Sequence, residues 1–327
     1  MRSFGKWLGR VLLVIVVAGV ALWLLAPRET LDPRVTFDAS ALPDDLDTWL
    51  ASREAVFGDI TPGAQKQIVW AGAKGVRTPL AVIYLHGFSA TLEEVRPLPD
   101  NVASALGANL YFARLAGHGR PGAAMGAVVA EDWITDLDEA LAIGHRLGDR
   151  VLVIATSTGG TLATLAAIDP ARAEGVAGVV LISPNYRLRS RLAQGMLDAP
   201  FVRVWGALVA GPERSFAPMN EDHAKWWTTR YPTAALFPMA TLMRHVRALD
   251  PGLARLPALF LYAPDDRVVD PATTAAVAAR WGADAVVDHP VLTAADDPWS
   301  HVIAGRVMSP GQTAPRVRKV LDWAKGL

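Results

Sequence analysis

The chain has 327 residues, of which 51% are hydrophobic and 20% charged, so it is long enough to bury a sizeable core. Its 32 basic residues equal its 32 acidic ones, which leaves no basic surplus to attract nucleic acid. It contains no cysteine, and this excludes disulfides, cysteine-ligated metals and a thiol nucleophile.

Residues 1–27 form a segment of their own. Three basic residues (Arg2, Lys6 and Arg10) come before the uncharged run 11–26, and no acidic residue occurs there. As a helix, residues 7–26 would span roughly 30 Å, about one hydrocarbon thickness. A cleaved signal peptide and a buried core helix are the alternatives. No A-x-A site follows the run, and Pro27 would obstruct cleavage after Ala26. We therefore expect an uncleaved single-pass membrane anchor.

The basic flank also predicts an orientation. Basic residues keep their end of a membrane span in the cytoplasm. The rest of the chain should then lie outside the cytoplasm, on the periplasmic side in a Gram-negative host. Residues 28–65 are rich in Asp and Pro with weak periodicity, and we expect them to be a connector.

From residue 66 onward, short apolar runs alternate with helical patterns. Strands are expected over residues 80–85, 109–113, 151–155, 176–182, 258–262 and 285–291. Helices are expected over part of 92–106 and over 131–147, 160–168, 272–281 and 314–324. This alternation predicts an α/β fold with a mostly parallel, doubly wound sheet and helices on both faces.

One interval interrupts the alternation. The stretch between residues 182 and 258 is far longer than one crossover requires, and it is rich in aromatic residues and methionine. We expect an inserted helical lid over residues 186–250, which divides the core into 66–185 and 251–327. Trp226 and Trp227 within it are compatible with an acyl pocket or with the lid's own core, and the sequence does not separate the two.

Ser157 lies where a buried strand meets a helix of small residues. A nucleophilic serine on a strained turn needs small neighbours two residues away, and Ala155 and Gly159 meet that need. The usual pattern, G-x-S-x-G, has glycine where this chain has Ala155. The alternative is a plain turn capped by Ser157 or Thr158. Ser157 is the candidate nucleophile.

Partners for this serine follow later strands. Asp265 and Asp266 come directly after the strand 258–262, and His301 follows the next strand. Serine needs an imidazole to take its proton, and the imidazole needs a carboxylate to orient it. The order serine, acid, histidine is that of α/β-hydrolases.

Backbone amides are the expected stabilisers of a developing oxyanion. In this arrangement one amide follows the nucleophile and the other lies in the loop after an earlier strand. Thr158 and Phe88 occupy those positions. We expect His86 and His118, in the loops after the first two strands, to be structural.

Five motifs together resemble the α/β-hydrolase superfamily, and within it bacterial carboxylesterases and monoacylglycerol-lipase-like serine hydrolases. They are HGFS at 86–89, RLAGHG at 114–119, ATSTGG at 155–160, DDRVV at 265–269 and SH at 300–301, within a similarity that covers residues 68–327. The resemblance implies that Asp266, one residue before an x-Val-Val run, is the catalytic acid. The serine usual after the 117–119 loop is absent, and Arg120 stands there instead.

The sequence thus predicts a membrane-anchored serine hydrolase that cleaves carboxylic esters through an acyl-enzyme, with apolar acyl esters as substrates. No cofactor, metal or nucleic acid is expected. His289, Asp296, Asp297 and His301 lack the spacing of a metal site. His145, His223 and His245 are expected to be surface or packing residues. The rivals are an acyltransferase with the same triad and a catalytically silent binding scaffold.

Overall fold

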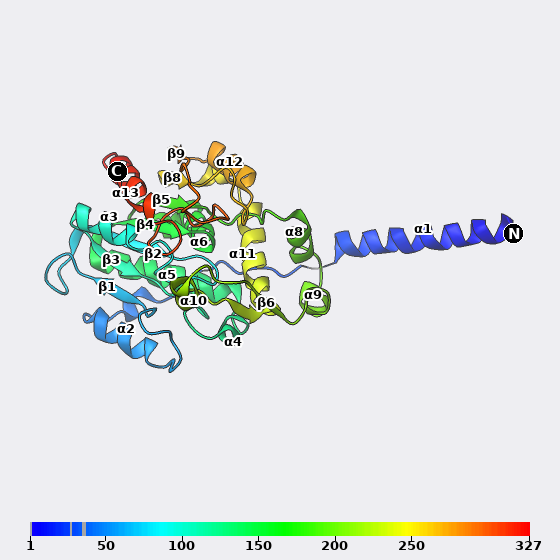
Figure 1. The fold of residues 1–327 in the computed structure, drawn as a ribbon, viewed down its shortest axis with the longest axis horizontal. Helices are drawn as coiled ribbons and strands as arrows, with labels where there is room; N and C mark the ends of the chain where they lie inside the picture. Colours follow the sequence, from blue (N-terminus) through cyan, green and yellow to red (C-terminus); the bar gives the residue numbers. More distant parts are fainter. Residues whose placement is uncertain (1, 27, 35–36) are drawn as a thin grey trace.

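The computed structural model describes residues 2–26, 28–34 and 37–327 (Figure 1), without the side chains of Arg2 and Ser3. Pro27, which the expectation of an uncleaved segment uses, lies outside the described residues. Helix α1 (Arg2–Leu25) projects away from the rest of the molecule, and none of its apolar stretch is buried. It is long and apolar enough to cross a membrane, a property that a signal sequence shares.

The core is a seven-stranded sheet in the order β1-β3-β2-β4-β5-β8-β9. Its strands are β1 (Gln67–Val69), β2 (Thr78–Leu85), β3 (Asn109–Phe112), β4 (Gly148–Thr156), β5 (Val176–Ile182), β8 (Ala258–Leu261) and β9 (Ala285–Asp288). Among the described strands of this sheet, β1 alone pairs antiparallel. The predicted α/β-hydrolase fold is therefore confirmed, with all six expected strands. The short edge strand β1 was not expected, because it has only three residues and begins with the polar Gln67.

Helices cover both faces of the sheet because side chains of a strand alternate between faces. In β2, Ala81, Ile83 and Leu85 lie in one core cluster and Val82 and Tyr84 in the other. The first cluster receives α5 (Ala130–Leu147), α6 (Thr158–Ile168) and part of α12 (Pro271–Ala279). The second receives α3 (Leu98–Leu106) and α13 (Pro310–Ala324). Two short helices, α4 (Gly122–Met125) and α7 (Pro170–Ala173), lie in connecting loops.

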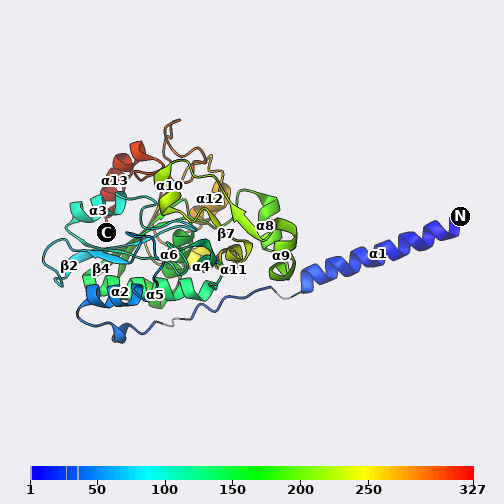
Figure 2. The same cartoon turned by 60° about the horizontal axis from the view of Figure 1, so that its bottom comes forward.

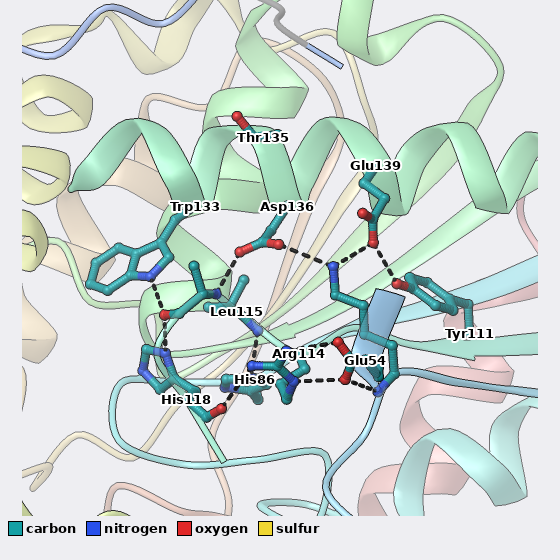
Figure 3. Close-up of polar contacts among 12 residues, drawn as sticks. Glu54, His86, Tyr111, Arg114, Leu115, His118, Trp133, Thr135, Asp136 and Glu139 are labelled. Atoms are coloured by element: carbon teal, nitrogen blue, oxygen red, sulfur yellow. Dashed lines mark hydrogen bonds and ion pairs between the residues drawn. The ribbon is translucent and has the colours of Figure 1, made fainter. Parts of the chain in front are cut away.

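Residues 28–65 are more structured than a connector. They contain the 3-10 turn η1 (Ala39–Ala41) and helix α2 (Leu46–Glu54), and Leu46 and Leu50 are buried in the core. The Glu54 carboxylate accepts two hydrogen bonds of 2.7 Å from Arg114 (Figure 3). This segment is thus part of the folded domain, and its weak periodicity concealed that.

The same polar network fastens helix α5 to the sheet. The Lys66 ammonium lies 3.2 Å from Asp136 and 2.5 Å from Glu139, and Tyr111 donates a 3.1 Å bond to Glu139 (Figure 3). Asp136 also accepts the Ala116 amide at 2.6 Å. Because buried charges are tolerated only when they are paired, these contacts fix α5 and the loop after β3 in one arrangement.

The long interval after β5 is largely helical, as predicted. It contains α8 (Arg191–Leu197), α9 (Val202–Ala210), α10 (Glu221–Trp226), the turn η2 (Thr233–Ala235), α11 (Leu236–Ala248) and a small ribbon of β6 (Glu213–Ser215) with β7 (Arg230–Pro232). Helix α11 packs against α6 and α5, and its Leu242 and Met243 are buried. The end of the interval is therefore part of the core. The turn η3 (Pro251–Leu253) follows it.

Candidate active site

Ser157 occupies a strained turn between β4 and α6. Its backbone has φ 52° and ψ −112°, a region that residues with a Cβ rarely adopt. A Cβ added to Gly159 would lie 2.2 Å from the Leu85 carbonyl oxygen, so the turn accepts only glycine there. Ser157 makes no side-chain capping bond to α6. The geometry is that of a nucleophile elbow rather than of a capped turn.

His301 and Asp266 lie in line with Ser157. The Ser157 Oγ is 3.1 Å from His301 Nε2, and His301 Nδ1 is 2.8 Å from Asp266 Oδ2. The other Asp266 oxygen accepts the amides of Val268 and Val269 at 2.7 and 2.9 Å, which fixes the carboxylate. The structure thus brings together three side chains from loops that are far apart in the sequence.

The charge around His301 favours its protonated form. Burial by itself lowers the pKa of His301. The attraction of Asp266, the hydrogen bond to it and the nearby carboxylates of Asp297 and Glu94 together outweigh burial, so the pKa is raised. Asp297 contributes to the same effect, and its carboxylate accepts the amides of His301 and Val302 at 3.0 and 2.8 Å. The imidazole is therefore held in place and is a stronger base than an isolated one.

The Phe88 amide belongs to the loop beside Ser157, and the Thr158 amide directly follows Ser157 in the chain. A Cβ on Gly87 would come within 3.0 Å of Ser157 Cβ, so the loop that carries Phe88 passes directly beside the serine. Neither the Phe88 amide nor the Thr158 amide donates a hydrogen bond to any residue that the structure describes. Both remain available for a developing oxyanion.

A pocket of about 370 Å³ opens at Ser157 and His301. Its apolar wall comes mainly from the lid and neighbouring loops: Phe88, Leu188, Phe216, Trp227, Tyr231, Leu236, Met239, Val268, Val302 and Met308. Trp227 therefore faces the pocket, while Trp226 packs against Gly63 and beneath the Lys225 ammonium. A larger hollow of about 470 Å³ between α2 and β1 has none of Ser157, Asp266 and His301 in its lining.

Glu94 is a residue at the site that the sequence analysis missed. It lines the pocket, and one of its oxygens accepts the Gly87 amide at 2.6 Å and the Tyr84 hydroxyl at 3.0 Å. Burial raises its pKa from 4.5 to about 7. No sequence signal separates it from exposed glutamates, because its burial depends on the fold of the loop around it.

His223 is a second such residue. It was expected to be a surface or packing residue, and it does pack between the rings of Phe216 and Trp227. It also lines the pocket, with Nδ1 accepting the Met219 amide at 3.1 Å. Burial lowers its pKa.

His86 and His118, the other histidines near the site, form hydrogen bonds that stabilise the loops after β2 and β3. His86 Nε2 accepts the Leu115 amide at 3.0 Å, and His118 Nδ1 lies 3.1 Å from the Ala116 carbonyl oxygen (Figure 3). Burial lowers the pKa of both rings, that of His118 to about 4. Within the described ranges, no group of three or more side chains is arranged to bind a metal ion.

Known proteins share this architecture. The family described as serine aminopeptidase, S33, matches residues 78–288. The thermostable monoacylglycerol lipase of Bacillus sp. (strain H-257) is 28% identical over 196 residues, which are 59% of this chain and 73% of that protein.

Solved structures give the same fold. A metagenome-derived lipolytic enzyme has a TM-score of 0.66 at 22% identity, over 82% of this chain and 100% of the other. The monoacylglycerol lipase of Paleococcus ferrophilus has a TM-score of 0.56 at 15% identity, over 79% of this chain and 97% of the other. A soluble variant of the monoglyceride lipase of Saccharomyces cerevisiae has a TM-score of 0.57 at 13% identity, over 81% of this chain and 92% of the other.

Proposed function

Because the chain belongs to the family described as serine aminopeptidase, S33, and is a carboxylic ester hydrolase with the α/β-hydrolase fold, we propose that it cleaves apolar acyl esters with Ser157 as nucleophile. The observation that carries the proposal is the continuous hydrogen-bond chain from Ser157 through His301 to Asp266, with distances of 3.1 and 2.8 Å. This hydrogen-bond chain begins at a serine on a strained turn, beside two backbone amides that donate to no described residue. This arrangement is suited to acyl transfer.

The proposed reaction has two steps. His301 Nε2 accepts the Ser157 proton as Oγ attacks the ester carbonyl, and the Phe88 and Thr158 amides stabilise the oxyanion. The tetrahedral intermediate collapses when the protonated imidazole donates its proton to the leaving alcohol. Water, deprotonated by the same imidazole, then attacks the acyl-enzyme and releases the acid. Asp266 stabilises the imidazolium in both steps.

The pocket supports an apolar acyl group as substrate. Its wall is formed mainly by aliphatic and aromatic side chains from the lid, and burial of each methylene contributes about 0.8 kcal/mol. The Bacillus relative is a monoacylglycerol lipase, which supports the same substrate class.

The location of the enzyme is part of the proposal. Helix α1 would anchor the chain in a membrane as a single span, with the basic N-terminal end in the cytoplasm and the hydrolase domain outside it. An apolar stretch of this length with no buried residue supports this, because such a helix is stable in lipid and not in water.

The test compares Ser157→Ala with Ser89→Ala in the full chain. Ser89 also lines the pocket, so it is a matched control for side-chain loss at the site. Ser157→Ala should abolish fluorophosphonate labelling and hydrolysis of p-nitrophenyl esters, while Ser89→Ala keeps the label. Longer acyl esters should be hydrolysed with higher kcat/KM than the acetate. Labelling that persists in Ser157→Ala would refute the assignment of the nucleophile.

A further inference from the structure

Helix α9 presents an apolar surface to solvent. Phe201, Val204, Leu208 and Val209, here called the α9 patch, are 55, 75, 86 and 65% exposed. Phe201, Val204 and Leu208 are spaced by three and four residues, so they form one stripe along the helix. The opposite side is packed, since a Cβ on Gly206 would lie 3.2 Å from the Phe237 ring. An exposed apolar stripe of this kind marks a surface that contacts an apolar partner.

The residues that follow α1 are bound to this part of the lid. The Glu29 carboxylate accepts bonds of 2.6 and 2.7 Å from Arg203 in α9, and its carbonyl accepts one of 2.8 Å from Arg244 in α11. Arg28 donates to the Asp198 carbonyl, just after α8, at 3.1 Å. Figures 1 and 2 both show α8 and α9 at the end of the domain from which α1 leaves.

The short tether limits the distance between α9 and the end of α1. Helix α1 ends at Leu25, and Glu29 lies four residues further on. Four residues reach at most roughly 15 Å when extended. The headgroup zone extends about 5–7 Å beyond the hydrocarbon on each side. A helix held at Glu29 is therefore kept at or just above the headgroups of any bilayer that α1 spans.

The charges around the patch fit such a surface. Arg191 begins α8, Arg214 follows α9, and both are exposed. The acid beside Arg214, Glu213, pairs with Arg230 at 2.9 Å. The carboxylate of the neighbouring Asp198 forms an ion pair with Arg247 at 2.8 Å. Basic side chains beside an apolar helix face are the composition that binds anionic headgroups while the apolar face enters the interface.

We propose that the α9 patch inserts into the headgroup region of the same bilayer that holds α1, so that the lid lies on the membrane. This inference rests on the proposed membrane anchor. Helix α9 packs on the turn before α11, and Leu236 and Met239 of α11 line the pocket. The lid would then separate the pocket from the lipid by one layer of helices, close to esters dissolved in the membrane.

The chain has no cysteine, so single spin labels can be introduced without other changes. The experiment places a nitroxide at Leu208→Cys in the full chain in nanodiscs of phosphatidylcholine and phosphatidylglycerol. The control is Val76→Cys, which is 56% exposed in the loop between β1 and β2 at the other end of the domain. Oxygen should relax the Leu208 label several-fold more than a nickel chelate does, and the order should be reversed at Val76.

Equal accessibility of the Leu208 and Val76 labels to the nickel chelate would overturn the proposal. Two measurements on the same sample separate this from failure of the proposed function. Retention of the chain in the discs reports on the anchor, and hydrolysis of p-nitrophenyl acetate reports on the active site. A chain that stays in the discs and hydrolyses the ester, but has a water-exposed Leu208 label, refutes only the docking of α9.

A second variant tests the consequence for activity. Leu208→Asp should lower hydrolysis of a long-chain ester in phosphatidylglycerol vesicles at least fivefold, because a charge opposes insertion of the patch. It should leave hydrolysis of soluble p-nitrophenyl acetate unchanged. Equal rates on the vesicle ester for Leu208→Asp and the unmodified chain would count against the proposal.

Discussion

Asp265 and Asp266 are adjacent in the chain, yet their carboxylates meet different surroundings. Asp266 is buried, 2.8 Å from His301, and accepts two backbone amides. Asp265 is exposed and accepts a 3.0 Å bond from the Ser300 hydroxyl. The difference follows from the turn after β8, which directs successive side chains to opposite sides.

Asp266→Asn should therefore lower kcat by about 10⁴, because an amide stabilises the wrong imidazole tautomer and no cation. Asp265→Asn should change it less than about tenfold, since exposed carboxylates contribute little. Steady-state hydrolysis of p-nitrophenyl butyrate by both variants checks this, with thermal unfolding to verify that each is folded. The opposite ranking would mean that Asp265 orients His301.

Glu94 predicts a pH dependence of stability. Its pKa in the folded chain, about 7, lies above the ordinary value of 4.5 because the carboxylate is buried. The stability it contributes is complete below about pH 4.5 and is lost as the pH rises through 7. Glu94→Gln keeps an acceptor for the Gly87 amide and cannot ionise. Raising the pH from 5 to 8 should lower the free energy of unfolding of both proteins. The decrease should be about 2–3 kcal/mol smaller in Glu94→Gln than in the unmodified chain.

Urea unfolding at the two pH values measures this difference directly. Identical pH slopes for Glu94→Gln and the unmodified chain would show that Glu94 does not titrate in this window. Because Glu94 holds the Gly87 amide beside Phe88, the variant also reports on the loop that carries the proposed oxyanion donor.

At the scale of elements, the turn from β4 into α6 leaves no room for a side chain at its glycines. Gly159 and Gly160 lie in the first turn of α6, a helix whose residues are all buried, and an added Cβ would meet Leu85 or Pro184. The lid is different, since Gly195 in α8 has nothing within 4 Å of an added Cβ. Glycine is thus required sterically in one helix and is merely tolerated in the other.

Gly159→Ala should lower the free energy of unfolding by about 1–3 kcal/mol through overpacking, and it should reduce esterase activity with it. Gly195→Ala should raise stability by roughly 0.5–1 kcal/mol, because alanine is the better helix former at an open site. Calorimetry of both variants gives the two signs. A stabilising Gly159→Ala would contradict the described elbow.

The lid is packed into the hydrolase core and is not the separate insertion that its sequence suggested. Its last helix, α11, contributes Phe237, Leu242 and Met243 to the same core cluster as the sheet. Removal of residues 186–250 as a unit would therefore open the core as well as the pocket. Selectivity for acyl chains is better examined by changes at Leu236 or Met239, which line the pocket.

For the whole molecule, the basic residues Arg2, Lys6 and Arg10 before the apolar run predict membrane topology. A C-terminal alkaline phosphatase fusion should be active in a Gram-negative host, and a fusion to a reporter that works only in the cytoplasm should be silent, because the basic flank retains the N-terminus inside. The intact mass should include residues 1–27. A mature N-terminus near Arg28 would refute the anchor but leave export intact.

Much of the site could be predicted from the sequence because its signals are local. The small residues around Ser157 reflect a turn that excludes larger ones, and the apolar runs of β3, β4, β5 and β8 reflect strands buried on both faces. Ser157, Asp266 and His301 lie close together because the ends of parallel strands meet at one edge of the sheet. The turn and the strands need only the residues beside them to be recognised, whereas the choice of Asp266 over Asp265 came from the family resemblance.

Other features were decided only by the tertiary structure. The burial of Glu94, the docking of α2 through Glu54 and Arg114, and the contact between Glu29 and Arg203 all join residues whose roles depend on distant partners. A carboxylate looks the same in a sequence whether it faces water or a buried amide. Its pKa and its role are set by the partners that folding brings to it, and no local pattern encodes those partners.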